Sequence, residues 1–139
     1  MRYLIDTNIF IFVATDPCRL SRDVKHILSD YETQVCISME SVKELIVAYK
    51  NRGFDMRKWH SADEFIRAVR DDYHFTILPI GIETMETYSR LRLNVAEEHW
   101  DPSDHVIISQ ALTEKLPLIS SDHKFLFYRK QGLDLIYNE

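Results

Sequence analysis

The apolar residues of this chain form short runs separated by amphipathic stretches. Five runs, rich in β-branched or large apolar side chains, have the length of strands and cover residues 3–5, 35–37, 75–80, 116–119 and 133–137. Two of the intervening stretches have apolar residues at helical spacing, namely Val42, Leu45, Ile46 and Tyr49, and then Ala62, Phe65, Ile66 and Val69. Segments 82–93 and 102–114 also have helical character.

Strand and helix therefore alternate from end to end. This alternation predicts an α/β fold with a central parallel sheet covered by helices on both faces, a three-layer α/β/α arrangement. A length of 139 residues predicts one domain, spanning 1–139. In open parallel sheets, ligands bind outside the carboxyl ends of the strands.

Four acidic residues are predicted to lie at that edge of the sheet. Asp6 ends the first strand, Glu44 follows the second, Asp104 begins the helix before the fourth, and Asp122 follows the fourth. Each also has a structural explanation, because acidic residues are favoured at and near helix N-termini. Convergence of all four on one edge is harder to explain by capping alone.

The local explanations differ in detail. Asp101 as N-cap followed by Pro102 makes a good helix start, which would leave Asp104 in the first turn. Glu44 fits a capping box with Ser41, but Ser38 is an equally good cap. Under the second alternative, Glu44 would lie in the second turn and be partly enclosed.

Crowded carboxylates at neutral pH need either protons or a cation. Oxygen ligands without a His or Cys cluster suit Mg²⁺ or Mn²⁺ better than zinc. Such an ion activates water and neutralises charge on a phosphate, which is how metal-assisted phosphodiester hydrolysis proceeds.

The overall charge fits this picture only if the acids are concentrated in one place. The net charge of −5 argues against a broad nucleic-acid-binding face. Setting the four acids aside leaves the rest of the chain close to neutral, so a polyanionic substrate is compatible. Cys18 and Cys36 follow no metal-binding or redox pattern, and no apolar segment reaches transmembrane length. These features predict a cytoplasmic protein without a membrane partner.

Four segments, YLIDTN, ISMESVKEL, DPSDHVIISQAL and PLISSDHKF, resemble the signature blocks of PIN-domain ribonucleases. Their order and spacing are most similar to those of VapC-type toxins of toxin–antitoxin pairs, and the resemblance runs from residue 3 to about residue 126. It implies a PIN-like fold, Mg²⁺- or Mn²⁺-dependent endoribonuclease activity on RNA, a homodimer and a cognate antitoxin.

The resemblance also assigns roles to residues. It makes Asp6, Glu44, Asp104 and Asp122 the catalytic and metal-binding quartet. The expected supporting residues are Asn8 beside the first acid, Ser120 beside the last, Asp101, which we prefer as a helix cap, and His105. His105 departs from the family pattern, because many relatives have Arg at this position.

The six histidines show no metal-ligand spacing, and besides His105 only His123 is expected near the site. Basic residues interleave with aromatic ones between residues 49 and 60, where RNA or an antitoxin would be contacted. The candidates are Lys50, Arg52, Arg57, Lys58 and Trp59. The alternative for this stretch is a solvated loop with anchoring aromatics.

Two other function classes stay open. One is a phosphatase-like α/β hydrolase with Asp6 as nucleophile, although Asn8 stands where such enzymes place a second Asp. The other is a catalytically inactive PIN-like binding module, which the presence of all four acids disfavours.

Overall fold

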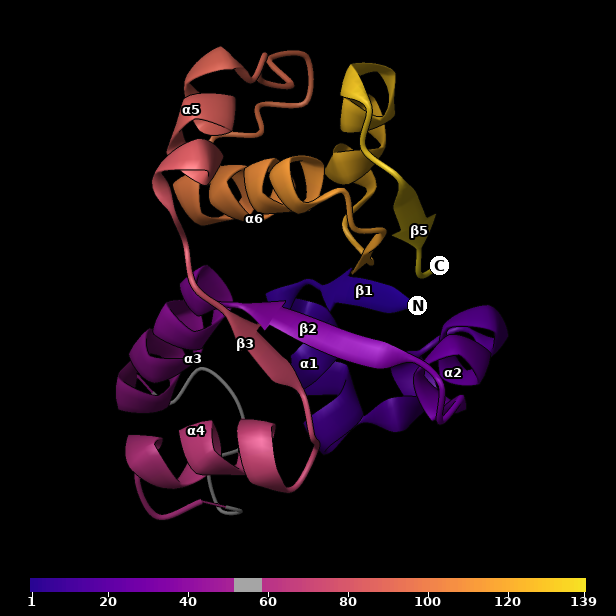
Figure 1. Ribbon diagram of the computed structural model, residues 1–139, viewed down its shortest axis with the longest axis vertical. Helices are drawn as coiled ribbons and strands as arrows, with labels where there is room; N and C mark the ends of the chain where they lie inside the picture. Colours follow the sequence, from indigo (N-terminus) through magenta and orange to yellow (C-terminus); the bar gives the residue numbers. More distant parts are fainter. Residues whose placement is uncertain (52–58) are drawn as a thin grey trace.

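The central element is a five-stranded parallel sheet with the order β3-β2-β1-β4-β5 (Figure 1). The computed structural model describes residues 1–51 and 59–139. The strands are β1 (Arg2–Ile5), β2 (Gln34–Ser38), β3 (Thr76–Leu78), β4 (Leu118–Ser120) and β5 (Leu135–Tyr137). All five predicted strands are present, and β3 ends early because Pro79 follows Leu78.

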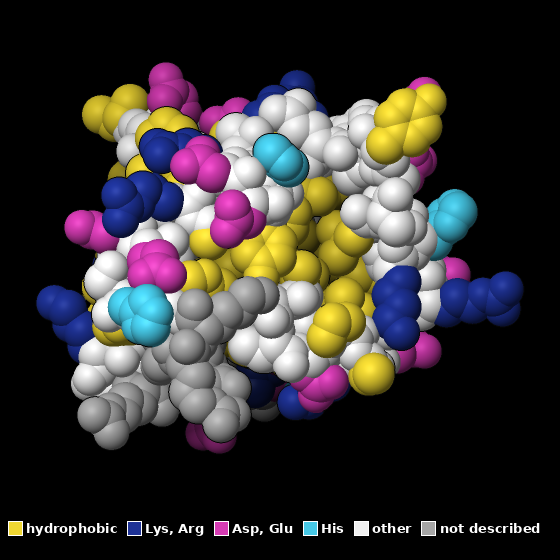
Figure 2. Space-filling model, turned by 90° about the horizontal axis from the view of Figure 1, so that it is seen from below, with side chains coloured by type: hydrophobic (Ala, Val, Ile, Leu, Met, Phe, Trp, Pro, Cys, Tyr) yellow, Lys and Arg dark blue, Asp and Glu magenta, His cyan; other side chains and the backbone are white. Residues whose placement is uncertain are grey.

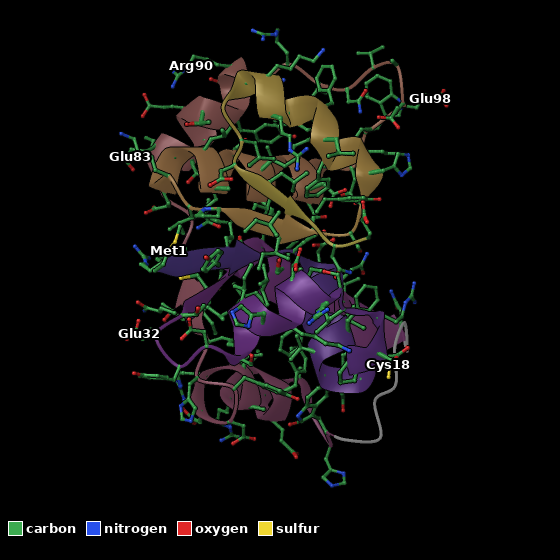
Figure 3. All side chains as sticks on the ribbon, turned by 90° about the vertical axis from the view of Figure 1, so that its right-hand side faces the viewer. Met1, Cys18, Glu32, Glu83, Arg90 and Glu98 are labelled. Carbon is green, nitrogen blue, oxygen red and sulfur yellow. The ribbon has the colours of Figure 1, made fainter. Side chains whose placement is uncertain are left out.

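Helices cover both faces of this sheet, which confirms the predicted three-layer α/β/α class. One layer contains α1 (Thr7–Thr15), α2 (Arg22–Ser29), α3 (Met39–Asn51) and α4 (Ala62–Asp71), with the short turn η1 (Pro17–Arg19). The other contains α5 (Ile82–Arg90), α6 (Pro102–Glu114) and the 3₁₀ segment η2 (His123–Gln131). Figure 3 shows these layers on either side of the sheet.

The strands supply two hydrophobic cores in alternation, because successive side chains point to opposite faces. Ile5 and Ile37 belong to the core under α1, α3 and α4, whereas Leu4 and Cys36 belong to the core under α6 and η2. Burial on both faces explains why the strands are continuously apolar. Phe65 in the α4 stripe is fully buried, as predicted for a core position.

Residues far apart in sequence become neighbours at the centre of the sheet. β1 pairs with β4, which places Ile5 opposite Ile119. Because both strands run in the same direction, Asp6 and Ser120 emerge at the same edge. Met1 and Glu98 lie on opposite sides in Figure 3, so the loop that carries Glu98 lies away from the amino end of β1.

The face of the molecule formed by α1 to α4 has an apolar hollow. Figure 2 shows hydrophobic side chains gathered in a depression at the centre of this face, with charged side chains around it. In the same layer, Ile11, Phe12 and Val13 of α1 pack on the core but stay partly exposed. Within the described residues, no helix has the length and hydropathy needed to cross a membrane.

Candidate metal and active site

Asp6 lies at the junction of β1 and α1 and has both carboxylate oxygens occupied. The backbone N–H of Thr7 donates to Oδ1 at 2.8 Å, so Asp6 caps α1. The Ser120 hydroxyl, at the end of β4, donates to Oδ2 at 2.9 Å. The side chain therefore bridges two adjacent strands, and the residue is only 4% exposed.

Burial makes this carboxylate hard to ionise. The pKa of Asp6 is raised from 3.8 to about 7, chiefly by burial and next by the nearby Asp104 carboxylate, with Glu44 adding to the rise. The hydrogen bonds from Ser120 and Thr7 act in the opposite direction. A group in this state binds either a proton or a cation at neutral pH.

Glu44 faces the same space from α3. The Ser38 hydroxyl accepts the N–H of Glu40 at 3.0 Å, so Ser38 caps α3 and Glu44 lies in the second turn. The Thr7 hydroxyl donates to Glu44 Oε1 at 2.6 Å and lies 2.8 Å from Ser41 Oγ. Ser41 thus supports the site instead of forming the capping box. Burial raises the pKa of Glu44, the Thr7 hydrogen bond lowers it, and Asp104 raises it.

Replacing Thr7 by valine is therefore expected to raise the pKa of Glu44 further and to destabilise the fold by about 1–3 kcal/mol, because two polar groups lose a partner. Carbon-detected NMR titration of glutamate carboxyls, together with urea unfolding, measures both effects. Thr7→Ser keeps the hydroxyl and is the matched control. If the pKa of Glu44 is the same in Thr7→Val as in wild type, the Thr7 hydroxyl does not interact with the Glu44 carboxylate.

Asp104 reaches the site from the first turn of α6. Asp101 caps this helix by accepting the N–H of Ser103 at 2.9 Å, as preferred from the sequence. The Asp104 side chain is 16% exposed, and its Oδ2 lies 2.9 Å from Nε2 of His99. Burial raises the pKa of Asp104, and the His99 hydrogen bond opposes that rise.

Asp122 completes the edge and is tied to Asp6 through one hydroxyl. Ser120 Oγ accepts the N–H of Asp122 at 3.1 Å while donating to Asp6. Asp122 Oδ1 also accepts the N–H of Lys124 at 3.0 Å, so this acid caps η2. Ser120 therefore lies between two of the acids, where the sequence placed it.

The helices that carry these acids are joined across the site. The Ser103 hydroxyl of α6 donates to Glu40 Oε2 of α3 at 2.7 Å, and Glu40 also pairs with Lys43. This contact sets the spacing between the helix that bears Asp104 and the helix that bears Glu44.

The four predicted acids thus meet at one edge of the sheet. Asp104 raises the pKa of both Asp6 and Glu44, and one ligand atom from each of His99, Asp104 and Asp122 lies within 4.8 Å of the others. This donor set, mainly hard carboxylate oxygens, suits a divalent cation such as Mg²⁺ or Mn²⁺. The pKa values of Asp6, Glu44 and Asp104 are raised chiefly by burial and further by neighbouring carboxylates, so their ionised forms are costly without a cation.

Some predicted supporting residues lie elsewhere. Asn8 is exposed on α1, and the groups described above hold Asp6 in its place. His105 is 2% exposed and donates from Nε2 to the backbone carbonyl of His99 at 2.8 Å, so it faces the interior instead of a phosphate. Burial lowers the pKa of His105. His123 pairs with Glu97 at 2.9 Å.

The expectation that His105 and His123 are the only histidines near the acids was wrong, because His99 also lies there. His99 is 2% exposed and contacts Asp104, yet it belongs to a loop without periodic spacing. The only hint in the sequence is its place two residues before the helix cap Asp101.

The basic stretch is only partly covered by the structure. Lys50 is exposed at the end of α3, whereas Arg52, Arg57 and Lys58 lie outside the described residues. Trp59 is 5% exposed and packs on Phe65 with ring centroids 5.9 Å apart. Its ring is an anchor of the core, as in the alternative reading of this stretch, and it does not present a face for base stacking.

Comparison with known proteins agrees with this fold. The PIN domain family model matches residues 3–132, so the chain belongs to the PIN-domain family. Among curated proteins, no relative matches the sequence.

Solved structures with the same fold include toxin–antitoxin proteins. VapBC2 from Rickettsia felis, bound to a DNA fragment from its promoter, aligns with a TM-score of 0.74 and 18% identity over 100% of both chains. VapBC-1 from nontypeable Haemophilus influenzae aligns with a TM-score of 0.67 and 21% identity over 99% of this chain and 98% of that one. FitAcB from Neisseria gonorrhoeae has a TM-score of 0.63 and 20% identity, covering 99% and 97%.

Proposed function

We propose that this chain is a metal-dependent endoribonuclease that hydrolyses RNA phosphodiester bonds and is the toxin of a toxin–antitoxin pair. The observation that carries the proposal is the meeting of Asp6, Glu44, Asp104 and Asp122 at the carboxyl edge of a PIN-family sheet. The raised pKa values support a bound cation, because burial and neighbouring carboxylates make the ionised acids costly and a cation would offset that cost.

In this proposal Asp6, Asp104 and Asp122 hold Mg²⁺ or Mn²⁺ directly or through water. When bound, the ion supplies an activated water and offsets charge on the scissile phosphate. Glu44 lies beside Asp104 and is held by Thr7, so it orients the attacking water and accepts its proton. Thr7 and Ser120 fix the carboxylates before substrate arrives.

An aspartyl-nucleophile phosphatase is disfavoured by the same geometry. Both oxygens of Asp6 accept hydrogen bonds from the protein and the residue is 4% exposed, so neither oxygen is free for in-line attack on phosphorus. A nucleophile needs an accessible, ionised oxygen. Failure to trap a phosphoenzyme with a phosphate-monoester substrate would agree with the nuclease proposal.

The direct test is cleavage of a folded RNA and of single-stranded RNA by the purified chain with Mn²⁺ or Mg²⁺. We expect cleavage that EDTA stops, and a loss on the order of 100- to 1,000-fold in Glu44→Gln and Asp104→Asn. Single-stranded DNA of the same sequence serves as the substrate control. Full activity of either variant, or no cleavage of any RNA by a folded, metal-loaded chain, would contradict the proposal.

We also propose an antitoxin partner. Two of the structures with the same fold are a VapBC2 assembly from Rickettsia felis and a toxin–antitoxin complex from Klebsiella pneumoniae, and the hollow on the α1–α4 side offers apolar area for a partner segment (Figure 2). Growth arrest on expression, relieved by a neighbouring short reading frame but not by an unrelated antitoxin, is the expected result. The homodimer stays a prediction, as does cytoplasmic action, with which the free thiols Cys18 and Cys36 are consistent.

A further inference from the structure

We propose that His99 is a positioning residue for Asp104, held in one tautomer by Tyr128, and that it leaves Asp104 a single free oxygen for the cation. The inference builds on the proposed metal-dependent function and adds a residue outside the acidic quartet. It is carried by a chain of hydrogen bonds between the 91–101 loop, η2 and α6.

The chain of hydrogen bonds begins at a backbone amide and ends at the metal site. The N–H of Asn94 donates to the Tyr128 hydroxyl at 3.1 Å, and that hydroxyl lies 3.0 Å from Nδ1 of His99. Nε2 of His99 lies 2.9 Å from Asp104 Oδ2. Tyr128 is fully buried and His99 is 2% exposed, so water does not compete for these bonds.

The direction of donation follows from both ends of this chain, because an ionised Asp104 carboxylate can only accept. The Tyr128 oxygen accepts from Asn94, and its own proton is then available to donate to Nδ1 of His99. A neutral imidazole that accepts at Nδ1 carries its proton at Nε2. His99 therefore donates from Nε2 to Asp104 Oδ2, which is the arrangement that supports a carboxylate.

The imidazole is also fixed in orientation. Its ring lies edge-on to His105 with centroids 5.0 Å apart and packs on Phe125 at 5.5 Å. His105 Nε2 donates to the His99 carbonyl, and the Asn94 side chain donates to the Lys124 carbonyl at 3.1 Å, which anchors the loop at two points. The donor that faces Asp104 thus cannot rotate away without disturbing the core.

A carboxylate held in this way has one oxygen engaged by the protein and one available to an ion. Partners that orient a metal ligand typically change metal affinity by about 10- to 100-fold when they are removed. We therefore expect His99 to act on the affinity for metal through Asp104, and we expect no nitrogen in the coordination shell itself.

The test is a Mn²⁺ titration followed by electron paramagnetic resonance of the free ion, on the full chain at constant pH. His99→Leu removes the donor and is expected to weaken Mn²⁺ binding by about 10- to 100-fold. His99→Gln places an amide N–H near the position of Nε2 and should recover most of the affinity. Tyr128→Phe keeps the ring but frees the tautomer, so we expect an intermediate loss. His26→Gln, which changes an exposed histidine on α2 away from the site, is the matched control and should bind as wild type does.

Three outcomes would overturn the inference. The first is wild-type Mn²⁺ affinity in a His99→Leu protein whose thermal melt shows it to be folded. The second is equal loss in His99→Leu and His99→Gln, because a purely structural role would not distinguish them. The third is a ¹⁴N coupling to bound Mn²⁺ in pulsed measurements that disappears in His99→Leu, which would make His99 a direct ligand. By contrast, absence of Mn²⁺ binding by the wild-type chain would contradict the proposed function itself and, with it, this inference.

Discussion

Asp6→Asn is expected to abolish RNA cleavage and at the same time to make the metal-free protein more stable at pH 8. Cleavage should fall on the order of 1,000-fold under the proposed function, since a carboxylate that we propose holds the metal is lost. Moving a pKa from 3.8 to about 7 means that keeping Asp6 ionised costs the fold up to about 4 kcal/mol. The amide has no charge to bury and can still accept from Thr7 and donate to Ser120.

Urea unfolding in EDTA at pH 8, beside single-turnover cleavage in Mn²⁺, measures both effects. Asp134→Asn makes the same chemical change at an exposed position before β5 and should alter neither quantity. A lower free energy of unfolding in Asp6→Asn than in wild type would contradict the prediction, because it would show that the carboxylate stabilises the metal-free fold.

Mn²⁺ is expected to raise the melting temperature strongly at pH 8 and only weakly at pH 5.5. The ionised forms of Asp6, Glu44 and Asp104 are disfavoured in the fold, because the pKa of each is raised chiefly by burial. The metal-free protein therefore loses stability as pH rises from 3.8, the ordinary pKa of aspartate, to about 7, where Asp6 ionises in the fold. The cation removes that cost, whereas at low pH protons occupy the same oxygens.

At 100 times the dissociation constant, a ligand adds about 2.7 kcal/mol, which corresponds to roughly 10 °C for a domain of this size. Thermal melts with and without Mn²⁺ between pH 5.5 and 8 test the prediction. The Asp6→Asn variant, melted under the same conditions, serves as the control. An equal shift at both pH values would place the cation away from these acids.

Much of the site was predictable from the sequence because its geometry follows from the sheet. Asp6 and Asp122 directly follow strands, and parallel strands bring their carboxyl ends together whatever lies between them. Asp104 was predictable through α6, whose start is fixed by Asp101 and Pro102. The helical spacing of Ala62, Phe65, Ile66 and Val69 gives α4 one apolar face, and the structure buries Phe65 and Val69 of that face.

Features that depend on irregular backbone were not predictable. His99 reaches Asp104 from a loop, so no spacing rule connects them. The choice between Ser38 and Ser41 as cap of α3 was decided by Thr7, which occupies the Ser41 hydroxyl from another helix. Helix α2 was overlooked, although Ser21 as cap with Val24, Ile27 and Leu28 following it gave a sufficient signal.

The strand order β3-β2-β1-β4-β5 also has a consequence for synthesis on the ribosome. β1 lies at the centre of the sheet and pairs with β4, which is translated more than a hundred residues later. A nascent chain consequently has its first acid exposed but lacks the last one, so the acidic edge of the sheet is complete only when translation is almost finished.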